Sequence, residues 1–165
     1  MLSSCSTMGQ EEPSGYHHHE PIVSADYQAR MPEHITTSEK TVLVDPNLHA
    51  WGAYGSDGNL VRGGIATSGA SYCPDIHRAC KTSSGTFRIY SLGEPSCKSK
   101  IFPVGRGGAP MPNCMYFHGG EALHGSYELA DANISHGCVR MDVSDSDWLR
   151  NDFANIGTKV IVRPY

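Results

Sequence analysis

One short run, Ser135-His136-Gly137-Cys138-Val139-Arg140, constrains the fold and the chemistry of this chain more than any other feature. Gly137 permits a tight or left-handed turn immediately before the cysteine, as a strained nucleophile turn requires. A thiol acts as a nucleophile when a nearby base accepts its proton and backbone N–H groups receive the resulting oxyanion. His118 and His124, a short distance upstream, are candidate bases. The run therefore predicts an enzyme that uses a cysteine nucleophile.

Length and composition limit the class of protein. The chain has 165 residues, which suits one domain with a hydrophobic core and an additional tail. A net charge of −4 at pH 7 and the lack of a basic stripe in the sequence argue against nucleic acid and anionic membrane surfaces as partners. The 18 glycines and 10 prolines favour a β-rich domain with many loops over a helical bundle.

The hydrophobic pattern divides the chain at about residue 38. Residues 1–38 are polar, contain scattered prolines and show no sustained period, so we expect a flexible N-terminal tail or tether. Residues 39–165 read as a mainly β domain, a mixed or antiparallel sandwich or barrel-like fold. Its expected strands are 41–44, 49–54, 60–66, 86–90, 114–118 and 158–163, and the runs 122–124 and 138–141 are expected at strand ends.

One helix is expected, in the C-terminal half of the chain. Ser144 is a suitable N-cap, and Asp147 follows three residues later, which approximates a capping box. Trp148, Leu149, Phe153 and Ile156 follow at helical spacing. Gly157 is expected to end the helix.

Four of the six cysteines lie around loop-like segments. Cys73 and Cys80 flank one such segment, and Cys97 and Cys114 flank a Gly- and Pro-rich one. Exported domains often close such loops with disulfides, but four cysteines allow about three pairings and the sequence does not select one. Four reduced cysteines in a cytosolic protein are the alternative. If these four cysteines form two disulfides, Cys138 is left unpaired, as a nucleophile must be.

Cys5 suggests a second modification. Leu2-Ser3-Ser4-Cys5 resembles the end of a bacterial lipoprotein signal, although an apolar region ahead of it is missing from this sequence. Either the true start lies upstream and Cys5 is lipidated, or Cys5 is an ordinary tail cysteine. Lipidation at Cys5 would be the one route to a membrane.

The chain resembles the catalytic domain of L,D-transpeptidases (the YkuD-type domain), bacterial enzymes that cross-link or remodel peptidoglycan. Ser135-His136-Gly137-Cys138-Val139-Arg140-Met141 matches the family's S-H-G-C-[IV]-R-[ML] signature at every position. The runs 82–87, 108–120 and 157–162 agree less specifically, and Ser83 stands where the family usually has proline. The resemblance covers roughly residues 40–165.

The resemblance implies a role for each candidate site residue. Cys138 would attack a stem peptide and form a thioester, with His124 as its base in preference to His118, which would line the substrate pocket. The Gly125 carbonyl would orient the His124 ring, and the N–H groups of Gly137 and Cys138 would receive the oxyanion. The remaining candidates, expected to contact substrate or anchor the turn, are Ser135, His136 and Arg140.

The expected partners are peptidoglycan stem peptides outside the cytoplasmic membrane, in the cell envelope or periplasm, and no cofactor is implied. The acceptor could be an amine, water or an envelope protein, which would give a transpeptidase, an L,D-carboxypeptidase or an enzyme that attaches or releases proteins. A catalytically silent peptidoglycan-binding domain is a different class. Another is a zinc-binding module using His118, His124, His136 and Cys138, although their spacing lacks the pairs that mark structural zinc sites.

Overall fold

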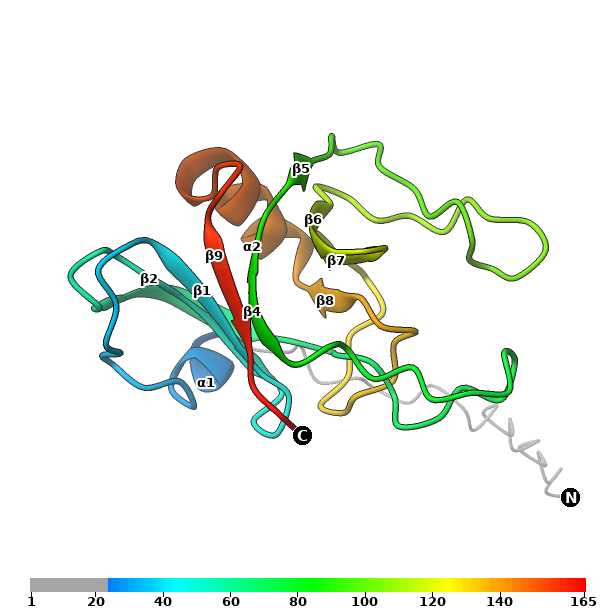
Figure 1. Cartoon of the computed structure of the whole chain (residues 1–165), viewed down its shortest axis with the longest axis horizontal. Coiled ribbons are helices and arrows are strands. Elements are labelled where there is room, and N and C mark those ends of the chain that lie inside the picture. The colour runs from blue at the N-terminus through cyan, green and yellow to red at the C-terminus, as the bar shows by residue number, and fades with distance from the viewer. Residues whose placement is uncertain (1–23) are drawn as a thin grey trace, which may run out of the picture.

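The computed structural model describes residues 24–165, which fold into two β-sheets packed face to face (Figure 1). One sheet has five strands in the order β3-β2-β1-β9-β4, and the other has four in the order β5-β6-β7-β8. The first contains β1 (Thr41–Asp45), β2 (Ala50–Tyr54), β3 (Leu60–Ile65), β4 (Gly85–Arg88) and β9 (Lys159–Val162). The second contains β5 (Ser91–Leu92), β6 (Met115–His118), β7 (Glu121–Gly125) and β8 (Val139–Met141). The expected mainly β fold is confirmed.

The main core lies between the sheets. Strand β1 is buried on both faces because Val42 and Val44 point into this core, while Leu43 joins a second cluster on the outer face of the five-stranded sheet. Val139 and Leu123 are fully buried partners of the core from the opposite sheet. A hairpin joins β1 to β2, as expected, whereas β9 pairs with β1 in parallel.

The second cluster explains a difference from the expected tail. Residues 24–38 include helix α1 (Ser24–Gln28), and the Tyr27 and Met31 side chains are buried with Leu43 and Ile65 against the five-stranded sheet. The Tyr54 hydroxyl also donates a hydrogen bond to the carbonyl of Pro32 at 2.8 Å. This part of the chain is therefore packed onto the domain. Residues 1–23, with Cys5, lie outside the described residues.

The expected helix is present, but it begins two residues earlier. Helix α2 spans Val143–Trp148, and its N-cap is Asp142, whose carboxylate accepts a hydrogen bond from the Ser144 N–H at 2.8 Å. An aspartate oxygen caps well and carries the negative charge that a helix N-terminus favours, so it displaces Ser144 from that role. The element continues as a π-helical turn, η1 (Leu149–Phe153).

Both disulfides join cysteines that are neighbours in the sequence, Cys73 with Cys80 and Cys97 with Cys114. Of the described cysteines, Cys138 alone is free. The two closed loops extend from the same side of the molecule (Figure 1). Within residues 24–165, no helix combines the length and the apolar character that crossing a membrane requires.

Candidate active site

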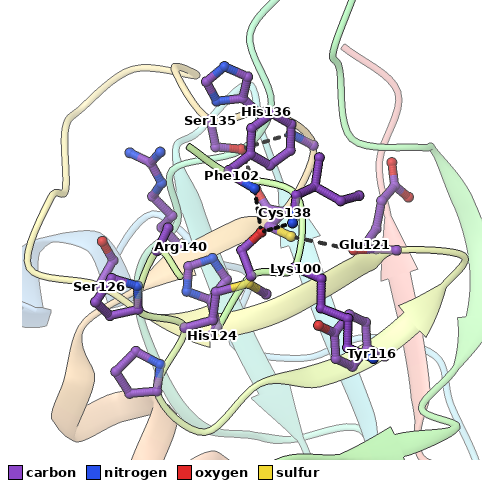
Figure 2. Close-up of a pocket in the computed structure, with 18 of the residues that line it drawn as sticks. Lys100, Phe102, Tyr116, Glu121, His124, Ser126, Ser135, His136, Cys138 and Arg140 are labelled. Carbon is purple, nitrogen blue, oxygen red and sulfur yellow. Dashed lines mark hydrogen bonds between the residues drawn. The ribbon is translucent and has the colours of Figure 1, made fainter. Parts of the chain in front are cut away.

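A pocket of about 910 Å³ opens beside the two disulfide loops and contains the free cysteine (Figure 2). Strands β7 and β8 form its floor. They pair in parallel, with Leu123 opposite Val139 and His124 opposite Arg140. Because successive side chains of a strand point to opposite faces, burial of Leu123 and Val139 in the core directs His124 and Arg140 to the pocket.

Cys138 lies immediately before β8, and its Sγ is 3.7 Å from the carbonyl oxygen of Gly120. Burial raises the pKa of the Cys138 thiol. The backbone N–H of Ala122 and the charge of Arg140 lower this pKa, while the Glu121 carboxylate raises it further. The thiol is therefore protonated at neutral pH, and a base must accept its proton before the sulfur can attack.

The turn before Cys138 is held by Ser135 and Thr82. Gly137 has a φ of 123°, a conformation that side-chain-bearing residues rarely adopt. The buried Ser135 hydroxyl accepts a hydrogen bond from the Gly137 N–H at 3.2 Å and donates one to the carbonyl of Cys138. Thr82 Oγ1 donates to the Gly137 carbonyl at 2.8 Å. Both hydrogen-bond partners of the Ser135 hydroxyl, the Gly137 N–H and the Cys138 carbonyl, thus belong to the turn itself.

Tyr165 supports this turn from behind. Its hydroxyl donates to the Gly69 carbonyl at 2.8 Å and lies 2.7 Å from the Thr82 N–H, which donates to it. Thr82 Oγ1 in turn accepts from the Gly69 N–H at 2.9 Å. Every member of the network has a partner, which makes Thr82 a fixed donor to Gly137.

His124 is the buried imidazole of the pocket. Its Nδ1 is 2.8 Å from the carbonyl oxygen of Gly125, the contact that the family resemblance implied. A carbonyl can only accept, so Nδ1 carries the proton and Nε2 of the neutral ring has a free lone pair. Burial lowers the pKa of His124 to about 4, the Gly125 carbonyl opposes this shift and Arg140 adds to it. The ring is therefore neutral at pH 7 and able to accept a proton.

Arg140 also lines the pocket, and its Nη1 is 3.4 Å from the carbonyl oxygen of Glu128 and 3.9 Å from the Glu128 carboxylate. Its backbone exchanges two hydrogen bonds of 2.9 Å with Thr67. Arg140 thus anchors the end of β8 and places a positive charge in the pocket.

His136 is held from two sides at the mouth of the pocket. Its Nε2 is 2.7 Å from an Asp75 carboxylate oxygen, and the Phe102 ring lies 4.5 Å from the His136 ring, centroid to centroid (Figure 2). Asp75 comes from the Cys73–Cys80 loop and Phe102 from the Cys97–Cys114 loop. His136 therefore links both disulfide loops to the turn that carries Cys138.

His118 lies outside the pocket. It is half-exposed on β6, where its Nδ1 is 3.1 Å from the Glu121 carboxylate and its ring lies 4.7 Å from the Phe87 ring, centroid to centroid, in a tilted arrangement. Of the two histidines considered as bases, the structure brings only His124 into the pocket with Cys138. It thus separates His118 from the other candidate residues.

Several pocket residues were not singled out from the sequence as part of the site. Glu121 lines the pocket and its carboxylate accepts hydrogen bonds from the N–H and hydroxyl of Ser83. Tyr116 also lines the pocket. In the sequence, the one indication that Glu121 belongs to the site is its position shortly before His124. Among those contributed by the disulfide loops are Arg78, Lys100, Ile101 and Phe102.

The zinc-binding alternative gains no support from this arrangement. Across residues 24–165, the one His/Cys/Asp/Glu group close enough together to hold a metal is Cys73, Asp75 and His136. Cys73 is bonded to Cys80, so its sulfur is not a thiolate ligand. His118, His124 and Cys138 do not belong to any such group of the described residues.

Comparison with known proteins assigns the fold. A family model described as the L,D-transpeptidase catalytic domain matches residues 39–162. No curated protein matches the chain. Among solved structures, an L,D-transpeptidase from Xylanimonas cellulosilytica is similar at 29% identity and a TM-score of 0.70, covering 80% of this chain and 64% of that one.

Two further structures have the same fold. An L,D-transpeptidase from Stackebrandtia nassauensis is 27% identical, with a TM-score of 0.61 and coverage of 78% of this chain and 58% of that one. L,D-transpeptidase 3 from Mycobacterium tuberculosis, solved with a faropenem-derived adduct, is 17% identical, with a TM-score of 0.61 and coverage of 76% and 60%. The chain thus spans less than two thirds of each of these solved chains.

Proposed function

Because the chain belongs to the family of L,D-transpeptidase catalytic domains, we propose that it transfers acyl groups between peptidoglycan stem peptides through a thioester on Cys138. The observation that carries the proposal is the pairing, in one pocket, of a free thiol with a neutral imidazole whose Nε2 lone pair is available. These are the two groups that cysteine-dependent acyl transfer needs.

In the first half-reaction, the Cys138 sulfur attacks the carbonyl of the third residue of a donor stem, at its bond to the terminal D-amino acid. His124 Nε2 accepts the thiol proton and returns it to the leaving amine. The carbon–nitrogen bond breaks, the D-amino acid departs, and a thioester to Cys138 remains. The hydrogen bond from Nδ1 to Gly125 supports this role because it holds the ring in the tautomer that can accept at Nε2.

The oxyanion of this step binds to the N–H groups of Cys138 and Gly137. The Gly137 N–H donates to the Ser135 hydroxyl in the free enzyme, so it exchanges this partner for the substrate oxygen. Backbone N–H groups directed at the oxygen stabilise the negative charge that develops on it. The positive φ of Gly137 supports this role, since it sets the direction of the peptide before Cys138.

In the second half-reaction, the amine of an acceptor stem attacks the thioester carbonyl and His124 accepts the amine proton. The carbon–sulfur bond then breaks, an amide to the acceptor remains, and His124 returns the proton to the Cys138 sulfur. Water as acceptor would make the enzyme an L,D-carboxypeptidase, and an envelope protein as acceptor or donor would make it a protein-linking or releasing enzyme. The volume of the pocket, about 910 Å³, is large enough for a peptide ligand, which supports a peptide acceptor.

We place this activity in the cell envelope. Two disulfides support an oxidising compartment outside the cytoplasm. Lipidation of Cys5 would anchor the domain to a membrane. Partition of the natively expressed protein into a detergent phase, lost in Cys5→Ser, would support the anchor; recovery of both forms in the aqueous phase would contradict it.

The experiment that tests the function uses a purified disaccharide-tetrapeptide as both donor and acceptor. Mass spectrometry should detect release of the terminal D-amino acid together with a cross-linked dimer, and neither product should form with Cys138→Ala. Release of the D-amino acid with only a tripeptide product would indicate the carboxypeptidase. If the parent protein binds the substrate and releases nothing, it is a silent binding domain and the proposal is wrong.

A further inference from the structure

The cations of this protein fall into two groups. All thirteen lysines and arginines lie within the described residues. Nine of them have a side-chain hydrogen bond, an ion pair or a ring contact, for example Arg62 with Asp145 and Arg88 with Glu39. The other seven of that group are Arg30, Lys40, Lys81, Arg140, Arg150, Lys159 and Arg163.

The remaining four cations are Arg78, Lys98, Lys100 and Arg106. Their side chains are exposed, and within residues 24–165 they make no such contact. All four lie on the disulfide loops: Arg78 in the Cys73–Cys80 loop and the others in the Cys97–Cys114 loop. The Cys97–Cys114 loop contains no aspartate or glutamate. Uncompensated positive charge is thus concentrated on one side of a protein whose net charge is −4.

These loops form a wall of the pocket, so their charge acts on whatever enters it. Arg78 and Lys100 both line the pocket. Figure 2 shows Lys100 in the same pocket as Cys138 and Arg140. The carboxylates of the pocket compensate little. Glu121 accepts hydrogen bonds from Ser83 and lies next to His118, and the Glu128 carboxylate is 3.9 Å from Arg140.

We propose that this cationic wall, defined as Arg78, Lys98, Lys100 and Arg106, selects donor stem peptides whose carboxyl groups are free and ionised over stems in which they are amidated. The inference rests on the proposed function, since it names the substrate preference of the same site. A cleft lined by one sign of charge focuses the field and raises the local concentration of oppositely charged ligands. Because these four side chains have no internal carboxylate partner, none must be displaced when a substrate carboxylate binds.

The test compares two donors that differ only in charge, a tetrapeptide stem with free side carboxyl groups and the same stem with carboxamides. We expect the parent protein to show a kcat/KM for the free-carboxyl donor higher by about three- to tenfold at low salt, and a smaller ratio at high salt. The double variant Arg78→Gln/Lys100→Gln should lose this preference, with a ratio of kcat/KM for the two donors close to one at both salt concentrations.

Two controls separate charge from folding. Lys40→Gln removes a cation far from the pocket, where Lys40 contacts Phe153, and it should retain the full preference. Alkylation of Cys138 by iodoacetamide, which is uncharged, should proceed at the parent's rate in the double variant if the pocket is intact.

Each outcome bears on one proposal. Equal rates of the parent on both donors, or equal loss on both donors in the double variant, would overturn the selection by charge while leaving the function in place. Turnover of neither donor by the parent would overturn the proposed function instead. If inorganic polyphosphate inhibits the parent and not the double variant while both donors react equally, the wall binds an anionic polymer and the donor preference is wrong.

Discussion

At the scale of single residues, the account depends on two neutral groups in one pocket. Burial raises the pKa of Cys138 and lowers that of His124 to about 4, so thiol and imidazole are both uncharged at pH 7. The pair is therefore set to exchange a proton when substrate binds, and it does not form a resting ion pair.

The depressed pKa of His124 predicts an unusual pH profile. His124 can act as a base only while unprotonated, and that form persists until the pH falls to about 4. The acid limb of kcat/KM should therefore have its midpoint near pH 4, below the value of about 6.5 for an ordinary histidine. Steady-state rates between pH 3.5 and 8 would measure it. A midpoint near 6.5 would contradict the assignment of a base whose pKa is depressed by burial.

The backbone conformation of Gly137 predicts that a side chain at this position would destabilise the protein through backbone strain. A methyl group at this position would meet no atom closer than 3.7 Å, but the φ of 123° disfavours any side chain. Gly137→Ala should lower the free energy of unfolding by about 1–3 kcal/mol and slow the alkylation of Cys138. Denaturant unfolding would measure the change in the free energy of unfolding. Gly120→Ala, with open space and no positive φ, is the stability control, and an equal loss there would remove the argument from strain.

At the scale of elements, the disulfide loops position one side chain of the signature. Asp75 and Phe102 hold His136 from either side, and the pair of Asp75 and His136 is partly exposed. Such pairs contribute about 0.2–1 kcal/mol, so their effect is more readily seen in substrate binding than in stability.

Asp75→Asn should raise KM for the donor stem by about two- to fivefold, with kcat and the unfolding midpoint little changed, because the pocket wall at Phe102 becomes less fixed. Steady-state kinetics would measure both parameters. His77→Asn is the matched control: it removes a ring from the same loop, asparagine tolerates the positive φ of His77, and His77 does not line the pocket. A fall in kcat alone would contradict this positioning role for Asp75.

Elements with local patterns could be predicted from the sequence, and contacts between distant segments could not. Alternation and turn residues located the hairpin of β1 and β2, and the runs that form β7 and β8 were expected at strand ends. The parallel pairing of β1 with β9, however, joins segments that the pattern does not connect. Helix α2 was expected, but its cap was misplaced because Asp142 and Ser144 are both suitable capping residues.

The same limit applies to the site. The signature located Cys138, and the resemblance to a known family selected His124. Asp75, Phe102 and Glu121 reach the site through folding of loops and sheets, so no local spacing marked them. The disulfide pairing was open for the same reason.

At the scale of the whole molecule, the five-stranded sheet is covered on both faces. The second sheet covers one face, and α1 with the following segment covers part of the other. Residues that resembled a tail thus complete the folded unit, since Tyr27 and Met31 supply apolar side chains that the outer face of β1 and β3 would otherwise expose to water.

Met31→Ala should therefore destabilise the protein by about 2–4 kcal/mol, as expected for a buried large-to-small change. Thermal or denaturant unfolding would measure it. The control is Glu33→Ala, in the same segment but exposed, which should change stability by less than about 0.5 kcal/mol. Equal stability of Met31→Ala and the parent would mean that residues 24–38 do not contribute to the fold.

The most direct test of the central claim is the intact mass of the protein after incubation with faropenem, the drug whose adduct is present in the M. tuberculosis structure. The account predicts one adduct on the parent, none on Cys138→Ala, slow labelling of His124→Ala and normal labelling of His118→Ala. An adduct that persists on Cys138→Ala, or a parent that remains unlabelled, would contradict the assignment of Cys138 as the nucleophile.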